Sequence, residues 1–126
     1  LTNPQTRESW GRNRLNLLVQ DIAATAFSIK PYLLLSCASW GIYRQTTIPG
    51  YDRFSSGYDS YLQDAVEWLN RGWMDFIVPM TYWDIPDPKP NFDELWMDFS
   101  RQTHHPSSVF MGIRSRLECK CLLVRK

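Results

Sequence analysis

Residues 73–84, WMDFIVPMTYWD, limit what this chain can fold into more than any other part of it. They predict one hydrophobic strand that ends in a polar and aromatic tip. Gly72 marks its start, and prolines crowd the residues beyond its end: Pro86, Pro88 and Pro90. Strands that are apolar on both faces are typical of parallel sheets covered by helices. Tyr, Trp and Asp at the carboxyl end of such a strand lie where α/β proteins place their ligand sites.

Length and composition favour one domain with a hydrophobic core. The chain has 126 residues, of which 44% are hydrophobic and 14% aromatic, so disorder is not expected. The net charge is +1 and no run of Lys or Arg stands out, so we expect no nucleic-acid partner. No apolar run approaches the ~20 residues of a membrane span, and none is predicted.

The termini and cysteines carry little chemistry. The amino-terminal residues LTNPQTRESWGR lack the features of a signal peptide. The chain also begins without Met, which indicates processing or an internal piece of a longer protein. The missing signal peptide therefore does not indicate the cellular compartment. Cys37, Cys119 and Cys121 form an odd set with one C-x-C pair, and we interpret them as incidental thiols rather than a metal site. No phosphate loop, nucleophile elbow or H-E-x-x-H occurs, so no metal and no cofactor are predicted.

Apolar spacing predicts a first helix-strand unit. The helix begins near Trp10 and ends before Pro31, and a strand is predicted over residues 32–38. The expected buried face of the helix consists of Leu15, Leu18, Ile22, Ala26 and Ile29.

Two further units follow. A Gly-, Pro- and Ser-rich connection over 45–57 leads to a second helix, for which Gly72 suits the position after the carboxyl end. Its expected buried face consists of Tyr58, Tyr61, Leu62, Ala65, Trp68 and Leu69. The 73–84 strand completes this unit.

The third unit begins with Asn91, which fits the N-cap of a helix, with Glu94 three residues on. Its stripe consists of Phe92, Leu95, Trp96 and Phe99, and a third strand is predicted over 108–113.

Alternating helices and strands without a hairpin signal predict an α/β fold with parallel strands and right-handed crossovers. A full (β/α)₈ barrel needs ~250 residues, so three units amount to about three eighths of one, or to a small open sheet. Residues 1–113 form this predicted partial barrel domain. Residues 114–126 break the pattern, as a terminal helix or as a sequence artefact.

Several stretches, taken in order, resemble a known family. Residues 10–22 read WGRNRLNLLVQDI, residues 29–31 read IKP, residues 41–44 read GIYR, and residues 57–83 read GYDSYLQDAVEWLNRGWMDFIVPMTYW. They are similar to glycosyl hydrolase-like family 10 proteins, in which W-R-R-x-N-(I/V)-N leads to K-P, S-P-F-G-I-W-R and G-W-(V/I)-D-Y-(I/L)-x-P-Q-x-Y-W. The likeness runs from Trp10 to about Gly112. The chain departs from it at Gly11, where the family has Arg.

The resemblance implies a (β/α)₈ barrel that hydrolyses glycosidic bonds of a polysaccharide or cell-envelope glycan, and therefore an extracytoplasmic location. Family members carry an acidic strand end, D-G-I-x-x-D-D-Y, that is absent here. The piece would then be inactive alone and would need the remaining half of its own barrel as a partner. A non-catalytic carbohydrate-binding barrel and a small open α/β interaction domain are the alternatives.

Candidate site residues are those at predicted strand ends. Sugar rings pack on aromatic side chains and Arg donates several hydrogen bonds, which favours substrate binding by Trp40, Tyr43, Arg44, Tyr82 and Trp83. Asp84 is the catalytic candidate, because it is the carboxylate just past a strand end, although glycoside hydrolysis needs a pair. Asp75, at a strand start, is expected to serve stability. The remaining Trp residues considered, predicted to lie in the core, are Trp10, Trp68, Trp73 and Trp96.

Overall fold

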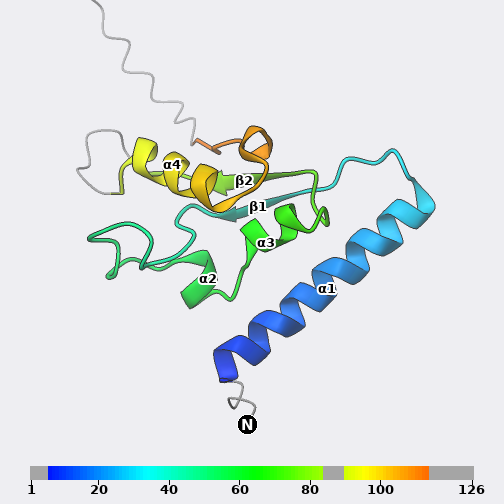
Figure 1. The fold of residues 1–126 in the computed structure, drawn as a ribbon, viewed down its shortest axis with the longest axis horizontal. Helices are drawn as coiled ribbons and strands as arrows, with labels where there is room; N and C mark the ends of the chain where they lie inside the picture. Colours follow the sequence, from blue (N-terminus) through cyan, green and yellow to red (C-terminus); the bar gives the residue numbers. More distant parts are fainter. Residues whose placement is uncertain (1–5, 84–89, 114–126) are drawn as a thin grey trace, which may run out of the picture.

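The computed structural model describes residues 6–83 and 90–113, so Asp84 and the 114–126 tail lie outside the described residues. A helix comes before each of the two strands, as expected, but two separate helices precede the second strand and a 3₁₀ helix follows the last α-helix (Figure 1). In order, the elements are α1 (Arg7–Ile29), β1 (Ser36–Trp40), α2 (Gly57–Ser60), α3 (Ala65–Asn70), β2 (Phe76–Met80), α4 (Phe92–Gln102) and the 3₁₀ helix η1 (Pro106–Ser108).

The sheet is parallel, which confirms the α/β class. β1 and β2 pair in register from Ser36 opposite Phe76 to Trp40 opposite Met80. Parallel bridges also join Ile77 to Val109 and Met80 to Gly112. Because β1 occupies one edge of β2 along its whole length, these bridges lie on the other edge. The strand predicted over 108–113 is therefore reduced to two bridges, and η1 takes up its first residue.

Both strands are shorter than the sequence predicts. The first begins at Ser36 instead of residue 32, because the chain turns after α1, with Leu33 N donating to Lys30 O. The second begins at Phe76 because Gly72 adopts a left-handed φ of 69° and the next two amides, of Trp73 and Met74, both donate to Trp68 O. These residues belong to the end of α3 and not to the sheet.

The single helix predicted from residue 58 to 69 is wrong: α2 and α3 are separate. α2 is capped by Ser56, whose side chain accepts from Asp59 N, and it ends at Ser60. Leu62 then adopts a φ of 60°, which no helix tolerates. The break turns Tyr61 out of the predicted buried face and leaves it exposed.

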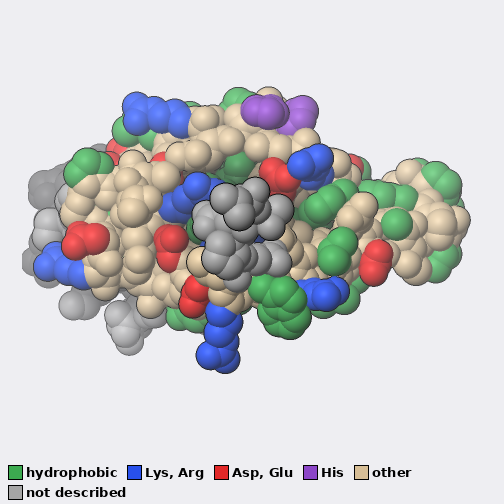
Figure 2. Space-filling model, turned by 60° about the horizontal axis from the view of Figure 1, so that its bottom comes forward, with side chains coloured by type: hydrophobic (Ala, Val, Ile, Leu, Met, Phe, Trp, Pro, Cys, Tyr) green, Lys and Arg blue, Asp and Glu red, His purple; other side chains and the backbone are tan. Residues whose placement is uncertain are grey.

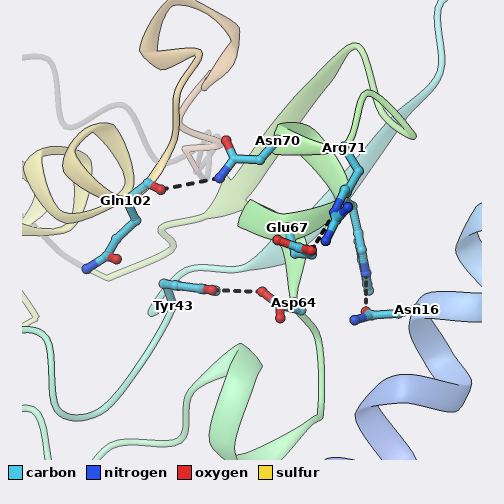
Figure 3. A network of polar contacts seen from close by, with 8 residues as sticks. Asn16, Tyr43, Asp64, Glu67, Asn70, Arg71 and Gln102 are labelled. Atoms are coloured by element: carbon cyan, nitrogen blue, oxygen red, sulfur yellow. Dashed lines mark hydrogen bonds and ion pairs between the residues drawn. The ribbon is translucent and has the colours of Figure 1, made fainter.

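The buried face of α1 also differs from the prediction. Val19 and Ala23 are buried, whereas Leu18, Ile22 and Ile29 are exposed. Both sets have helical spacing, and the packing of α1 against α3 decides between them. Figure 3 shows this packing at the Asn16 side chain, whose Oδ1 accepts from Trp68 Nε1 at 2.6 Å.

The four tryptophans predicted to be core residues divide. Trp68 is buried and Trp73 is half-buried, as expected. The prediction is wrong for Trp10 and Trp96, whose exposed fractions are 53% and 45%. The start of α4 is confirmed, because Asn91 Oδ1 accepts hydrogen bonds from both Asp93 N and Glu94 N.

The main core covers one face of the sheet. Ile77 of β2 and Cys37 of β1 point toward it, and side chains from three helices pack there: Val19 of α1, Val66, Trp68 and Leu69 of α3, and Phe99 of α4. Burial raises the pKa of the Cys37 thiol to about 11, so this cysteine is protonated at neutral pH. The helices α1, α3 and α4 thus share one side of the sheet.

The surface carries charges of both signs. Figure 2 shows basic and acidic side chains interspersed on one face of the molecule, with hydrophobic side chains reaching the surface at the end that holds the carboxyl end of α1. Within residues 6–83 and 90–113, no helix has the length and hydrophobicity needed to cross a membrane.

Replacing Gly72 by Ala is expected to destabilise the full-length protein by about 1 kcal/mol. The residue has a left-handed φ, and an added Cβ would meet nothing within 4 Å, so the cost is conformational and not steric. Urea unfolding followed by tryptophan fluorescence measures it. Gly72→Asn is the control and should cost less, because Asn adopts this conformation more readily. Equal losses in both variants would contradict the explanation.

Candidate functional site

The carboxyl ends of β1 and β2 lie side by side at one end of the sheet, and Gly41 lets them approach closely. A Cβ on Gly41 would lie 2.3 Å from the Met80 carbonyl oxygen and 2.7 Å from Cζ3 of Trp83. Neither distance is compatible with a side chain. The Trp83 indole therefore lies directly on the Gly41 backbone, and a residue with any side chain would displace it.

Trp40, the last residue of β1, is fixed from three sides. Its backbone N–H donates to Gln63 Oε1 at 3.1 Å, and its indole Nε1 donates to Ser55 O at 2.6 Å. Its ring centroid lies 4.6 Å from that of Tyr61. The loops that flank α2 thus orient a side chain that belongs to the sheet.

Trp40 and Trp83 share one apolar base. A second core cluster lies at this end and consists of Ile42, Ile48, Tyr51 and Leu95. Trp40, Phe54 and Trp83 pack against it. Tyr51 anchors the base to the start of α4, since its hydroxyl donates to Glu94 Oε2 and accepts from Asn91 N. The predicted binding residues Trp40 and Trp83 are therefore brought together.

Tyr43 lies elsewhere, inside the main core. Its hydroxyl donates to Asp64 Oδ1 at 2.7 Å (Figure 3), and its ring packs against Tyr58 and Phe99. Burial, with the Asp64 carboxylate beside it, raises the pKa of Tyr43 far above its usual value. Substrate binding by Tyr43 stays a prediction, and this burial favours a structural role instead.

Arg44 is held against an aromatic ring. Its guanidinium carbon lies 3.7 Å from the Tyr58 ring centroid, and that of Arg12 lies 3.5 Å from the same centroid. Two guanidinium groups this close cannot share a face, so the ring is covered on both sides. Arg12 also donates to Tyr58 O at 2.9 Å. The stack joins α1 to α2, and half-buried Arg44 is part of it.

The tip after β2 is more open. Tyr82 is 49% exposed, and Trp83 is half-buried on Gly41. Thr81 fixes the start of the tip, because its N–H and its hydroxyl both donate to Gly112 O at 2.8 Å. Asp84, the predicted catalytic residue, lies outside the described residues.

Carboxylates near this end hold segments of the backbone together. Asp59 accepts from Gln45 N and Ser56 Oγ, and Asp98 accepts from Thr47 Oγ1 at 2.9 Å. Burial raises the pKa of Asp98. At the opposite end, Asp75 accepts from Leu35 N at 2.7 Å, in agreement with its expected structural position. Each of these groups has a packing role already.

Sequence reasoning missed three residues that shape the site: Gly41, Tyr61 and Gln63. A glycine directly after a strand end is a signal of close backbone approach and could have been used. Tyr61 and Gln63 were hidden because helical spacing assigned that stretch to a continuous helix.

Comparisons with known proteins give the family to which the chain is similar. The family model for glycosyl hydrolase-like 10 matches residues 1–117. Glycosyl hydrolase DigH of Escherichia coli (strain K12) is 25% identical over 114 residues, which are 86% of this chain and 26% of DigH. Glycosyl hydrolase YngK of Bacillus subtilis is 27% identical over 110 residues, which are 83% of this chain and 22% of YngK. The chain spans about a quarter of the length of these curated relatives.

Replacing Gly41 by Ala is expected to destabilise the full-length protein by about 2 to 3 kcal/mol, because the Cβ collides with backbone as well as with Trp83. Urea unfolding measures the loss. Gly112→Ala is the matched control at the same sheet end, where a Cβ would lie 3.1 Å from Pro79 O. It should cost about 1 kcal/mol or less. A Gly41→Ala variant no less stable than Gly112→Ala would contradict the tight approach.

Proposed function

The chain belongs to the glycosyl hydrolase-like 10 family, which confirms the resemblance seen in its sequence, and on that premise we propose its function. The full-length protein acts on glycosidic bonds of a polysaccharide or cell-envelope glycan outside the cytoplasm. The described residues form part of its (β/α)₈ barrel and supply strand ends that bind sugar rings.

The arrangement of helices supports a barrel. The strands follow one another in sequence order across the sheet, and α1, α3 and α4 pack on one face. A doubly wound open sheet carries helices on both faces, whereas a (β/α)₈ barrel carries them only outside. The one-sided cover favours the barrel over a small open α/β domain.

The opposite sheet face supports it too. Phe76 and Val78 of β2 are only half-buried there, and Phe110, exposed by more than half, packs edge-on against Phe76 at 5.5 Å. In a barrel such side chains fill the interior. The remaining half of the barrel is thus the proposed partner that covers this face, together with exposed Leu18 and Ile22 of α1.

One observation carries the sugar-binding part: Trp40 and Trp83 pack on one apolar base at the carboxyl ends of adjacent parallel strands. Pyranose rings have flat C–H faces that pack on such aromatic surfaces. Exposed Tyr82 adjoins them in sequence. Arg44 and Tyr43 stay in the proposal as more distant contributors, since each is engaged in packing.

The catalytic carboxylates are proposed to come mainly from the rest of the barrel. Glycoside hydrolysis uses two carboxyl groups about 5 to 10 Å apart. Asp59, Asp64 and Asp98 each accept hydrogen bonds that hold the fold together. Asp84 remains the candidate from this chain. A barrel that binds glycans without cleaving them is the second candidate function, which these occupied carboxylates favour.

Replacing Trp83 by Ala in the full-length protein is expected to weaken glycan binding about tenfold, through loss of one stacking surface. Titration calorimetry with chitohexaose, cellohexaose and maltohexaose measures it. Trp96→Ala, at an exposed position on α4, is the control and should bind like the wild type. Release of new reducing ends separates hydrolysis from binding alone. A wild-type protein that binds none of these glycans contradicts the proposal.

Residues 1–126 expressed alone are expected to aggregate or to form a molten state. The sheet face away from the helices and one face of α1 are apolar and uncovered. Within the described residues β1 pairs with β2 alone, so its other edge is open. Dye binding to exposed apolar surface and the loss of near-ultraviolet circular dichroism measure this state. The full-length protein is the control. A sharp cooperative melt of a monomer would count against the barrel.

A further inference from the structure

The connection between α2 and α3 holds a residue in an unfavourable conformation. Leu62 has a φ of 60°, a region that residues with side chains rarely adopt. Such conformations persist only where the surroundings enforce them, and they cluster at ligand sites. The contacts around Leu62 therefore indicate what this turn is built to position.

Both residues after Tyr61 are fixed inward. Leu62 reaches α1, where its Cδ1 lies 2.7 Å from the position that a Cβ on Gly11 would take. Gln63 donates its N–H to Gly57 O at 2.8 Å and accepts the Trp40 N–H with its side chain. The turn is thus held to α1 on one side and to β1 on the other.

Tyr61 is the residue that this turn leaves facing solvent. It is 47% exposed, and its ring is tilted by 45° against Trp40 with centroids 4.6 Å apart. None of the hydrogen bonds found among the described residues involves its hydroxyl, which can therefore donate to a sugar hydroxyl group.

We propose that Tyr61 forms a second sugar-binding position beside Trp40, which extends the aromatic surface begun by Trp83. The occupant is a pyranose ring of the same glycan chain. This inference rests on the proposed function and assigns a residue that the family motif does not single out as a site. Trp83 lies on Gly41, the next residue after Trp40, so the three aromatic side chains follow one edge of the sheet.

The test uses the full-length protein and calorimetry with chitohexaose, cellohexaose and maltohexaose. Tyr61→Ala is expected to raise the Kd about tenfold, whereas Tyr61→Phe, which keeps the ring, stays within about threefold of the wild type. Tyr32→Ala is the matched control, because Tyr32 is 85% exposed and precedes β1, at the opposite end of the sheet. Its Kd should not change. Urea midpoints of the variants verify that folding is intact.

The outcomes separate the two ideas. Wild-type binding with an unchanged Kd for Tyr61→Ala overturns the second position and leaves the proposed function standing. Equal losses of affinity in Tyr61→Ala and Tyr32→Ala also overturn it, because the effect is then not specific to the position of Tyr61. A wild type that binds none of the three glycans overturns the proposed function itself. A loss confined to Tyr61→Ala, with Tyr61→Phe retained, supports the inference.

Discussion

The parallel pairing of β1 with β2 is the constraint on which the rest of the structure depends. Its register sets Trp40 opposite Met80, and this brings Gly41 against the Met80 carbonyl. At the other end, Asp75 N donates to Leu35 O while its carboxylate accepts from Leu35 N, which continues the pairing beyond the strands. If β2 slipped by one residue against β1, Ile77 would move out of the core. The slip would also remove the glycine from beneath Trp83.

Polar and aromatic side chains have different tasks around this sheet. Asp59, Asp64 and Asp98 join loops to helices, and Arg12 and Arg44 enclose the Tyr58 ring between α1 and the end of β1. These contacts are short and mostly sheltered, so they fix the backbone around the strand ends. The indoles at those ends are left only partly covered. A rigid frame of polar contacts thus presents aromatic surface at one edge.

Local signals in the sequence predicted local structure well. Asn91 caps α4 as expected, because a cap depends on residues within three positions, and Gly72 takes the left-handed conformation that ends α3. Helical spacing failed where distant contacts decide. Leu62 is a good helix former, yet packing over Gly11 breaks the helix there. The face of α1 was mistaken for the same reason: Leu18 and Val19 both fit the spacing, and only docking against α3 selects Val19.

The candidate site follows the same division. Trp40 and Trp83 were predictable because strand ends can be read from apolar runs, whereas Tyr43 has the same position in the pattern but turns into the core. Its neighbour in space, Asp64, lies 21 residues further along the chain, at the N-cap position of α3, so no local pattern relates the two. On the proposed function, glycan binding and glycan cleavage then come from different parts of the barrel. The carboxylates described here hold the aromatic side chains in place. A glycan bound to these side chains would therefore be cleaved by acids on other strands of the barrel.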